Sequence, residues 1–185
     1  PVEDKDIALL TPVALVQMII GVSTRLPVKT LPELIAHARA NPGKVNYGSS
    51  GPGGISHLAA ELFKAAAGID IVHVPYRGAA PAIVDLVAGR VDMMCLNIGS
   101  AKAQIESGEL RGLAVSGPQR AAALPNVPTF REGGIPMLAM DPGTWWGIMV
   151  PVKTPTDIIT RLNAAMREAV KEYLGWHLLV KARRK

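Results

Sequence analysis

Short apolar segments alternate with segments of helical periodicity along most of the chain. Apolar runs predict strands over residues 13–22, 45–47, 71–74, 91–96, 110–115 and 145–150. Helical segments follow most of them, over residues 31–40, 55–67, 80–88, 101–106 and about 155–174. Strands that alternate with helices are typical of βαβ units. We therefore predict an α/β fold in which a parallel sheet carries helices on its faces.

Two of these helices have clear sequence markers. Thr30 followed by Glu33 forms a capping box before the helix at 31–40, and the residues at 41–43, Asn-Pro-Gly, end that helix. Gly68 ends the helix at 55–67. The apolar face predicted for this second helix consists of Leu58, Leu62 and Ala66, with Ala59 and Phe63 beside them.

The composition of the chain changes after Gly117. Residues 118–143 are rich in Pro and Gly, which predicts a connector that leaves a first lobe. The strand at 145–150 and the last helix then belong to a second lobe that is largely absent from this sequence. Trp145 and Trp146 are adjacent in that strand and face opposite sides, so at most one lines a cleft and the other is expected in the core.

Composition and charge exclude several classes of protein. The sequence has 185 residues, of which 49% are hydrophobic and 4% aromatic. Its net charge is +5, but the last five residues supply +4, which leaves too little positive charge elsewhere for a nucleic-acid surface. Polar residues interrupt the longest apolar run, at 7–22, so no membrane-spanning helix is expected. Cys95 is the single cysteine and excludes an intramolecular disulfide.

Candidate chemistry gathers in two turns that each join a strand to a helix. The turns at 47–57 and 75–79 contain no Asp or Glu, and they offer hydroxyl, imidazole and guanidinium groups together with exposed main chain. Helix N-termini at the edge of a sheet present unpaired N–H groups to an anion. We interpret the two turns as a cradle for a carboxylate or another small oxyanion. The alternative is that their glycines and serines only form tight turns.

Enzyme and cofactor motifs do not fit these turns. The glycine spacing matches neither the nucleophile elbow, nor the dinucleotide fingerprint, nor the phosphate-binding loop. The four histidines are scattered at 37, 57, 73 and 177, and no cysteine pair accompanies them, so no metal and no cofactor are expected. A hydrolase that uses Ser50 or Ser56 with His57 remains the alternative, although no orienting acid is evident.

Several motifs occur in an order that points to a known family. They are TLPEL at 30–34, NPGK at 41–44, YGSSG at 47–51, HLAAE at 57–61, HVPYRG at 73–78, GRVD at 89–92, LRGLAV at 110–115 and LPNVPT at 124–129. The sequence over about residues 2–170 closely resembles the Bug-type, or tripartite tricarboxylate transporter, periplasmic solute-binding receptors. VPYRG and LPxVPT are the most specific of these strings.

The resemblance implies a type II periplasmic-binding fold, in which two α/β lobes close on a small carboxylic acid. It implies a periplasmic receptor without enzymatic activity that delivers its ligand to the membrane components of a secondary transporter, with no nucleic-acid partner and no direct membrane insertion. The expected domains are a crossover at 1–21, a ligand-binding lobe at 22–112, and a return crossover, connector and helix of an incomplete lobe at 113–185.

The resemblance also implies where the ligand binds. Family members bind largely through main-chain amides, hydroxyls and bridging waters, so we rank the glycine-rich turn above Arg77 alone. Leu96 occupies a position where many relatives carry Asp, which removes an acceptor for a ligand ammonium, so amino-acid ligands are not expected. The expected binding residues are Ser49, Ser50, Gly51, Gly54, Ser56, His57, Arg77, Gly78 and Ala79.

The sequence departs from the family at both ends. It does not start with Met, and the family's secretion signal and first glycine-rich loop are missing, so we expect the chain to be a fragment. Residues 175–185 lack the usual closing pattern. A sensing domain of a transcription regulator has the same two-lobed architecture and remains a further alternative, although no helix-turn-helix is evident.

Overall fold

The protein is described by a computed structural model that covers residues 6–135 and 144–174. The expectations for the first residues, for the end of the connector, for His177 and for the atypical C-terminal segment lie outside the described residues. The chain forms two compact units, one of residues 16–144 and one of residues 1–15 with 145–185. The domain boundaries expected at 21/22 and 112/113 concern the lobes of a longer protein and stay a prediction.

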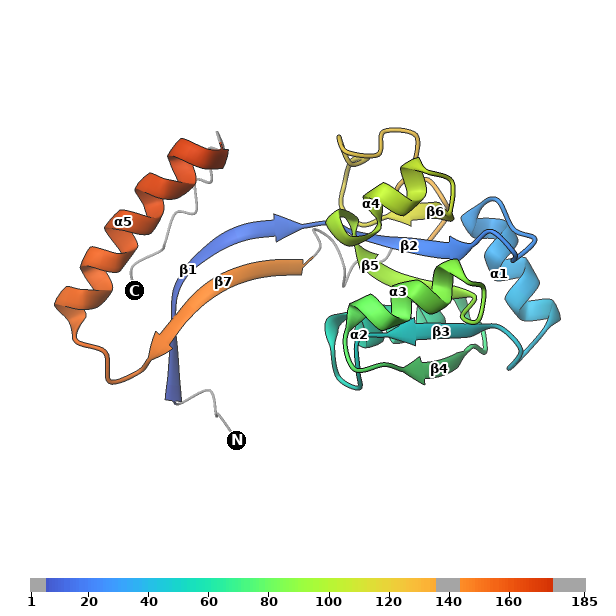
Figure 1. Ribbon diagram of the computed structural model, residues 1–185, viewed down its shortest axis with the longest axis horizontal. Coiled ribbons are helices and arrows are strands. Elements are labelled where there is room, and N and C mark those ends of the chain that lie inside the picture. The colour runs from blue at the N-terminus through green and yellow to red at the C-terminus, as the bar shows by residue number, and fades with distance from the viewer. Residues whose placement is uncertain (1–5, 136–143, 175–185) are drawn as a thin grey trace. The chain divides into compact units, whose positions relative to one another are not determined.

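The larger unit is built on a five-stranded sheet with the order β4-β3-β5-β2-β6 (Figure 1). Its strands are β2 (Met18–Ser23), β3 (Asn46–Ser49), β4 (Val72–Pro75), β5 (Met93–Asn97) and β6 (Leu110–Val115). β3 pairs in parallel with both β4 and β5, whereas β2 runs antiparallel to β5 and β6. The α/β class is confirmed, with a sheet that is mixed because β2 is reversed.

Four helices cover the two faces of this sheet. α1 (Leu31–Ala40) and α2 (Ile55–Ala67) share one buried cluster with the strands, and α3 (Ala79–Val87) and α4 (Ile98–Glu106) share the other. β5 contributes to both clusters through alternate residues: Met93 and Cys95 lie in the first, and Met94 and Leu96 in the second. The sheet is therefore the middle layer of three.

The strand predicted at 13–22 is two strands that belong to different sheets. β1 (Ile7–Val16) and β2 are separated by Gln17. The Gln17 side-chain amide donates to the backbone oxygens of Ser116, at 2.6 Å, and Gln119, at 3.0 Å. Its backbone oxygen accepts from the N–H of Ile98 at 3.1 Å. A single polar residue within an apolar run thus marks a change of sheet that hydrophobicity alone does not reveal.

The capping box predicted for α1 is confirmed. The hydroxyl of Thr30 accepts the N–H of Glu33 at 3.3 Å, and the Glu33 carboxylate accepts the N–H of Lys29 at 2.7 Å. These contacts satisfy two backbone donors at the helix start.

The buried face of α2 differs from the one predicted. Leu58 and Leu62 are 49% and 41% exposed. Ala59 and Phe63, predicted beside that stripe, are buried, and Ser56, Ala60 and Ala67 complete the buried face. Both stripes have the spacing of a helix face, so periodicity does not distinguish them. The small side chains of the alanines let the helix approach the sheet closely, and packing selects that stripe.

The segment at 118–135 returns along the sheet. Thr129 forms a parallel bridge with Val115, and Leu124 and Val127 join the core beneath α3 and α4. The Arg120 guanidinium donates to both carboxylate oxygens of Glu132, at 2.8–3.1 Å. This ion pair, together with hydrogen bonds from Thr129, lowers the pKa of Glu132 to about 2. The Pro-rich connector is thus partly a folded edge of the larger unit.

The smaller unit contains a two-stranded sheet of β1 and β7 (Thr144–Pro151) and the helix α5 (Thr156–Leu174). The strand and the helix predicted here are confirmed. The expectation that one of the two tryptophans is a core residue is wrong, because Trp145 is 53% and Trp146 55% exposed. A two-stranded sheet buries little of either of its faces. Of the helices that the structure describes, none has the length and apolarity of a membrane span.

The position of Phe63 at the centre of the α2 face gives a test of this packing. Phe63→Ala is expected to lower the free energy of unfolding by about 3–5 kcal/mol, because a fully buried aromatic side chain leaves a cavity. Leu62→Ala on the same helix is the matched control and should cost less than about 1 kcal/mol, because Leu62 is half exposed. Urea unfolding followed by circular dichroism measures both. Equal losses of unfolding free energy in the two variants would contradict the buried face described for α2.

Candidate functional site

The two acid-free turns lie side by side at one edge of the sheet. The N–H of Tyr76 donates to the backbone oxygen of Ser49 at 3.0 Å, and the N–H of Gly78 donates to that of Ser50 at 3.1 Å. The parallel pairing of β3 with β4 causes this, because the carboxyl ends of parallel strands meet at the same edge. The turns at 47–57 and 75–79 thus form one continuous surface.

A small cavity of about 60 Å³ opens at this edge. A space of this size accommodates a few waters or a single carboxylate group. Its polar walls come from two serines of the first turn and from the start of α4, and the rest is apolar apart from Cys95. No wall residue carries a formal charge. The cavity is lined by Met18, Ser50, Ile55, Ser56, Ala79, Met94, Cys95, Leu96, Asn97 and Ser100.

Three helices begin at this cavity, which we call the helix-start cavity. Their N-caps, all within the described residues, are Gly54 for α2, Gly78 for α3 and Asn97 for α4, and none provides a side-chain capping bond. The Asn97 side-chain oxygen accepts from the hydroxyl of Thr144 at 3.4 Å instead. The N–H of Ile98, the first of α4, donates to the backbone oxygen of Gln17 at 3.1 Å, and that of His57 in α2 donates to Gly54 at 3.0 Å. The other first-turn N–H groups have no side-chain cap and lie at the positive end of each helix dipole. Three such helix starts around one uncharged cavity favour a bound anion.

The two serines in the cavity wall are coupled to each other. The Ser56 hydroxyl oxygen accepts the N–H of Ser50 at 2.9 Å and lies 2.9 Å from the Ser50 hydroxyl. If Ser56 donates its hydroxyl hydrogen to Ser50, the Ser50 hydrogen is left to point at a ligand oxygen. The pair therefore provides at least one hydroxyl donor on the cavity side.

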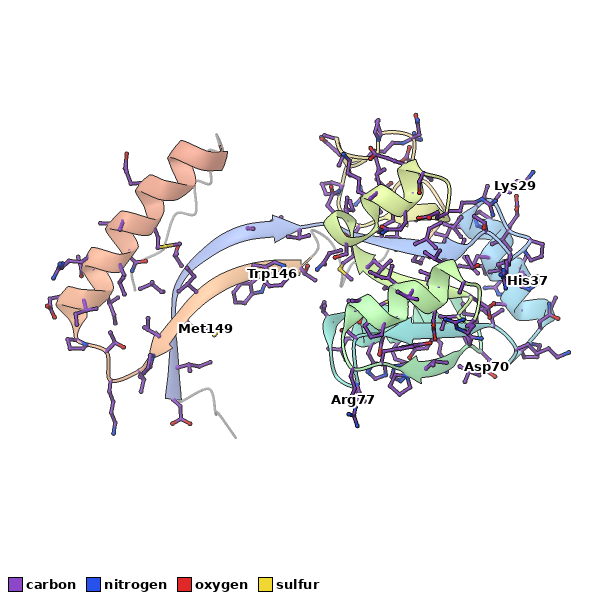
Figure 2. The ribbon with its side chains drawn as sticks, viewed as in Figure 1. Lys29, His37, Asp70, Arg77, Trp146 and Met149 are labelled. Carbon is purple, nitrogen blue, oxygen red and sulfur yellow. The ribbon has the colours of Figure 1, made fainter. Side chains whose placement is uncertain are left out.

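Only part of the residue set predicted for the site lines this cavity. Ser50, Ser56 and Ala79 do so. Ser49 is fully buried and bonded elsewhere, and Figure 2 shows the exposed Arg77 pointing away from the sheet. The remaining predicted residues belong to the two turns without lining the cavity: Gly51, Gly54, His57 and Gly78.

Sequence reasoning missed the third turn. Asn97 and Ser100 lie where β5 passes into α4, and β5 is the other parallel neighbour of β3. The carboxyl ends of parallel strands meet at one edge of the sheet, and this rule places the turn after β5 beside the other two. The signal was present as a strand followed by the helical segment at 101–106, but the residues between them contain no glycine-rich string. The apolar wall from Met18, Ile55, Met94 and Leu96 has no local sequence signal.

A group of stacked rings lies beside the cavity. The rings of His57 and His73 are 4.1 Å apart between centroids, and those of Tyr47 and His73 are 4.9 Å apart. The hydroxyl of Ser49 lies 2.6 Å from Nε2 of His73. Burial, and secondarily the neighbouring His57, lower the pKa of His73.

The hydrolase alternative requires a hydrogen bond between His57 and Ser50 or Ser56, and the structure gives these residues other partners. Nδ1 of His57 accepts the backbone N–H of Gly53 at 3.1 Å, while Ser50 and Ser56 bond to each other. The pair that does form, Ser49 with His73, is turned away from the cavity. Burial raises the pKa of the Cys95 thiol to about 12, so the cavity cysteine stays protonated and weakly nucleophilic. Among the described residues no group of three acidic, histidine or cysteine side chains is arranged to hold a metal.

Comparison with known proteins agrees with this geometry. Residues 2–181 match the model of the tripartite tricarboxylate transporter family receptors. The chain belongs to this family. A UPF0065 protein of Pseudomonas sp. strain P51 is 38% identical over 168 residues, which are 90% of this chain and 49% of that protein. The chain therefore spans about half the length of such a relative.

Solved structures of the family superpose well. A protein of R. palustris with adipate is 35% identical, with a TM-score of 0.81 over 93% of this chain and 56% of that one. MatC from Rhodopseudomonas palustris, with bound malate, is 30% identical, with a TM-score of 0.77 over 87% and 57%. The resemblance inferred from the motifs is thus confirmed, and with it the periplasmic-binding-protein fold.

The close contact between the two turns depends on Gly51. Its φ is +134°, and a Cβ at this position would lie 3.4 Å from the backbone oxygen of Tyr76. Gly51→Val is expected to lower the free energy of unfolding by about 1–3 kcal/mol, through backbone strain, and to shift the amide resonance of Gly78. Gly68→Asn is the control, because Gly68 has a left-handed φ of +59° in open space, which Asn tolerates. Urea unfolding and amide NMR measure both, and an unchanged Gly78 amide in Gly51→Val would show that the turns do not depend on this contact.

Proposed function

We propose that the protein is an extracytoplasmic receptor that captures a small carboxylate and performs no bond chemistry on it. The observation that carries this proposal is the convergence of three helix starts without side-chain caps on one uncharged cavity. Backbone N–H groups and the Ser50 hydroxyl would hold the carboxylate oxygens. The adipate and malate in the two structural relatives are carboxylates and support this ligand class.

Several features favour binding over catalysis. Within the described part of the chain, the Ser50 hydroxyl has no histidine partner for activation and bonds to the hydroxyl of Ser56. The thiol of Cys95 is held neutral by burial. A nucleophile needs an adjacent base within hydrogen-bond reach or a lowered pKa, and neither serine nor the cysteine has one. The hydrolase alternative therefore has little support from the site geometry.

The cavity walls narrow the ligand class. They contain no Asp or Glu, so a ligand ammonium would lack a partner there. The cavity of about 60 Å³ has room for a carboxylate group. We infer that this unit holds one carboxylate end and that the rest of the ligand extends toward the family's other lobe.

The remaining parts of the proposal follow from family membership. Ligand binding would favour closure of two lobes, and the closed form would be recognised by the membrane components of a secondary transporter. We propose a periplasmic location on the same ground. The chain spans about half of its relatives, so closure and delivery are proposed for the full-length protein.

Isothermal titration tests the proposed function. Adipate, malate and glutamate are titrated into the full-length protein and into this chain. We expect the full-length protein to bind a carboxylate without an ammonium more tightly than glutamate, and this chain to bind it more weakly because half of the cleft is missing. Product formation from any ligand, abolished by Ser50→Ala, would instead support the enzyme.

Matched variants test which groups carry the binding. Ser56→Ala leaves the Ser50 N–H without its acceptor and disturbs the hydroxyl pair, so we expect affinity to fall about tenfold or more. Arg77→Gln removes an exposed charge outside the cavity wall and should weaken binding less, by about threefold or less. If Arg77→Gln weakened binding more than Ser56→Ala, the carboxylate would bind to Arg77. That result would contradict the helix-start cavity as the binding site.

A further inference from the structure

We propose that His57 and His73 are positioning residues for the binding loop, which we define as residues 49–53, and that His57 holds it only while its imidazole is neutral. Ligand capture would then weaken in mildly acidic solution. This inference rests on the proposed function, because the loop contributes Ser50 to the helix-start cavity. Neither imidazole lines the cavity.

The contact of His57 requires an unprotonated ring nitrogen. Its Nδ1 accepts the backbone N–H of Gly53 at 3.1 Å, so the neutral ring carries its hydrogen on Nε2. Protonation places a second hydrogen on Nδ1, where it meets the hydrogen of the Gly53 amide. The hydrogen bond is then replaced by a repulsive contact, and the far end of the loop loses its support.

The contact of His73 fixes the near end of the loop. Its Nε2 lies 2.6 Å from the hydroxyl oxygen of Ser49, which is fully buried. The same oxygen accepts the N–H of Gly51 at 3.2 Å. The imidazole is therefore linked through one hydroxyl to the main chain on both sides of Ser50, and the two histidines together fix the loop at both ends.

The surroundings favour neutral rings. The centroids of the two imidazoles are 4.1 Å apart, a separation at which two positive charges repel strongly. The titratable groups around them are Tyr47 on β3, Glu61 on α2 and Cys95 on β5. Glu61 favours a charged His73, but its carboxylate already accepts the hydroxyl of Tyr47, and its influence is smaller than that of burial and His57.

The sign of the pH effect follows from these contacts. The pKa of His73 is lower in the folded protein than the ordinary imidazole value of about 6.5, so the unfolded chain binds more protons below that value. The contribution of the neutral His73 ring to the free energy of unfolding is complete above about pH 6.5. It is lost as the pH falls toward the lowered pKa of His73. We expect ligand affinity to fall between pH 7.5 and 5.5, because protonation of His57 removes the acceptor of the Gly53 N–H.

Amide NMR of the full-length protein without ligand tests the positioning role. Between pH 7.5 and 5.0 we expect the Gly53 amide to titrate together with the ring of His57, and the Gly51 amide with the ring of His73. His57→Phe keeps a stacked ring but should abolish the titration of Gly53. His37→Phe, on α1 away from the cluster (Figure 2), is the control and should leave both amides unchanged. Amides that do not titrate, or that titrate equally in His57→Phe, overturn the proposal.

Titration calorimetry with adipate and malate at pH 7.5 and 5.5 tests the consequence for binding. We expect weaker binding at pH 5.5 than at pH 7.5, and a loss of this pH dependence in the double variant His57→Phe/His73→Phe, whatever its affinity at pH 7.5. Equal affinity at both pH values overturns the proposal. If neither acid binds at any pH while the loop amides still titrate as expected, the proposed function fails but the positioning role stands.

Discussion

The parallel pairing of β3 with β4 and β5 is the constraint on which the rest of the site depends. Three adjacent strands that run in one direction bring their carboxyl ends to the same edge of the sheet, and each passes directly into a helix. The starts of α2, α3 and α4 therefore meet, and residues of each helix start line one cavity. No charged side chain is needed to make this edge attractive to an anion. The positive potential comes from the backbone, and the side chains only shape the space.

The layers beside the sheet keep this edge in place. Both faces of the central strands are buried, one under α1 and α2 and the other under α3 and α4. β2 is reversed, lies between β5 and β6, and is buried along its whole length. The binding edge is thus the end of a three-layer structure. The loop at 49–53 is bonded to this structure through Ser56, Tyr76 and Gly78, and it also contacts His57 and His73.

Much of this arrangement is encoded locally and could be predicted from the sequence. The start of α1 is encoded by Thr30 and Glu33, and the neighbouring positions of two turns follow from the rule for parallel strands. The packing of α2 could not be predicted, because its two candidate stripes have the same periodicity and differ only in how closely they let the helix approach the sheet. The reversal of β2 and the third turn of the cavity also depend on pairing between distant strands, which an apolar run does not encode. The composition of the cavity wall therefore required the three-dimensional structure.

The glycine caps have a consequence for any attempt to stabilise this protein. Gly54 and Gly78 begin helices without offering an oxygen to them, although Asp or Ser at such a position usually stabilises a helix. An acidic cap there would place the protein's own carboxylate on the N–H groups that a ligand carboxylate needs. The substitution would thus create an internal competitor for the ligand, and at Gly78, where φ is +112°, it would also strain the backbone.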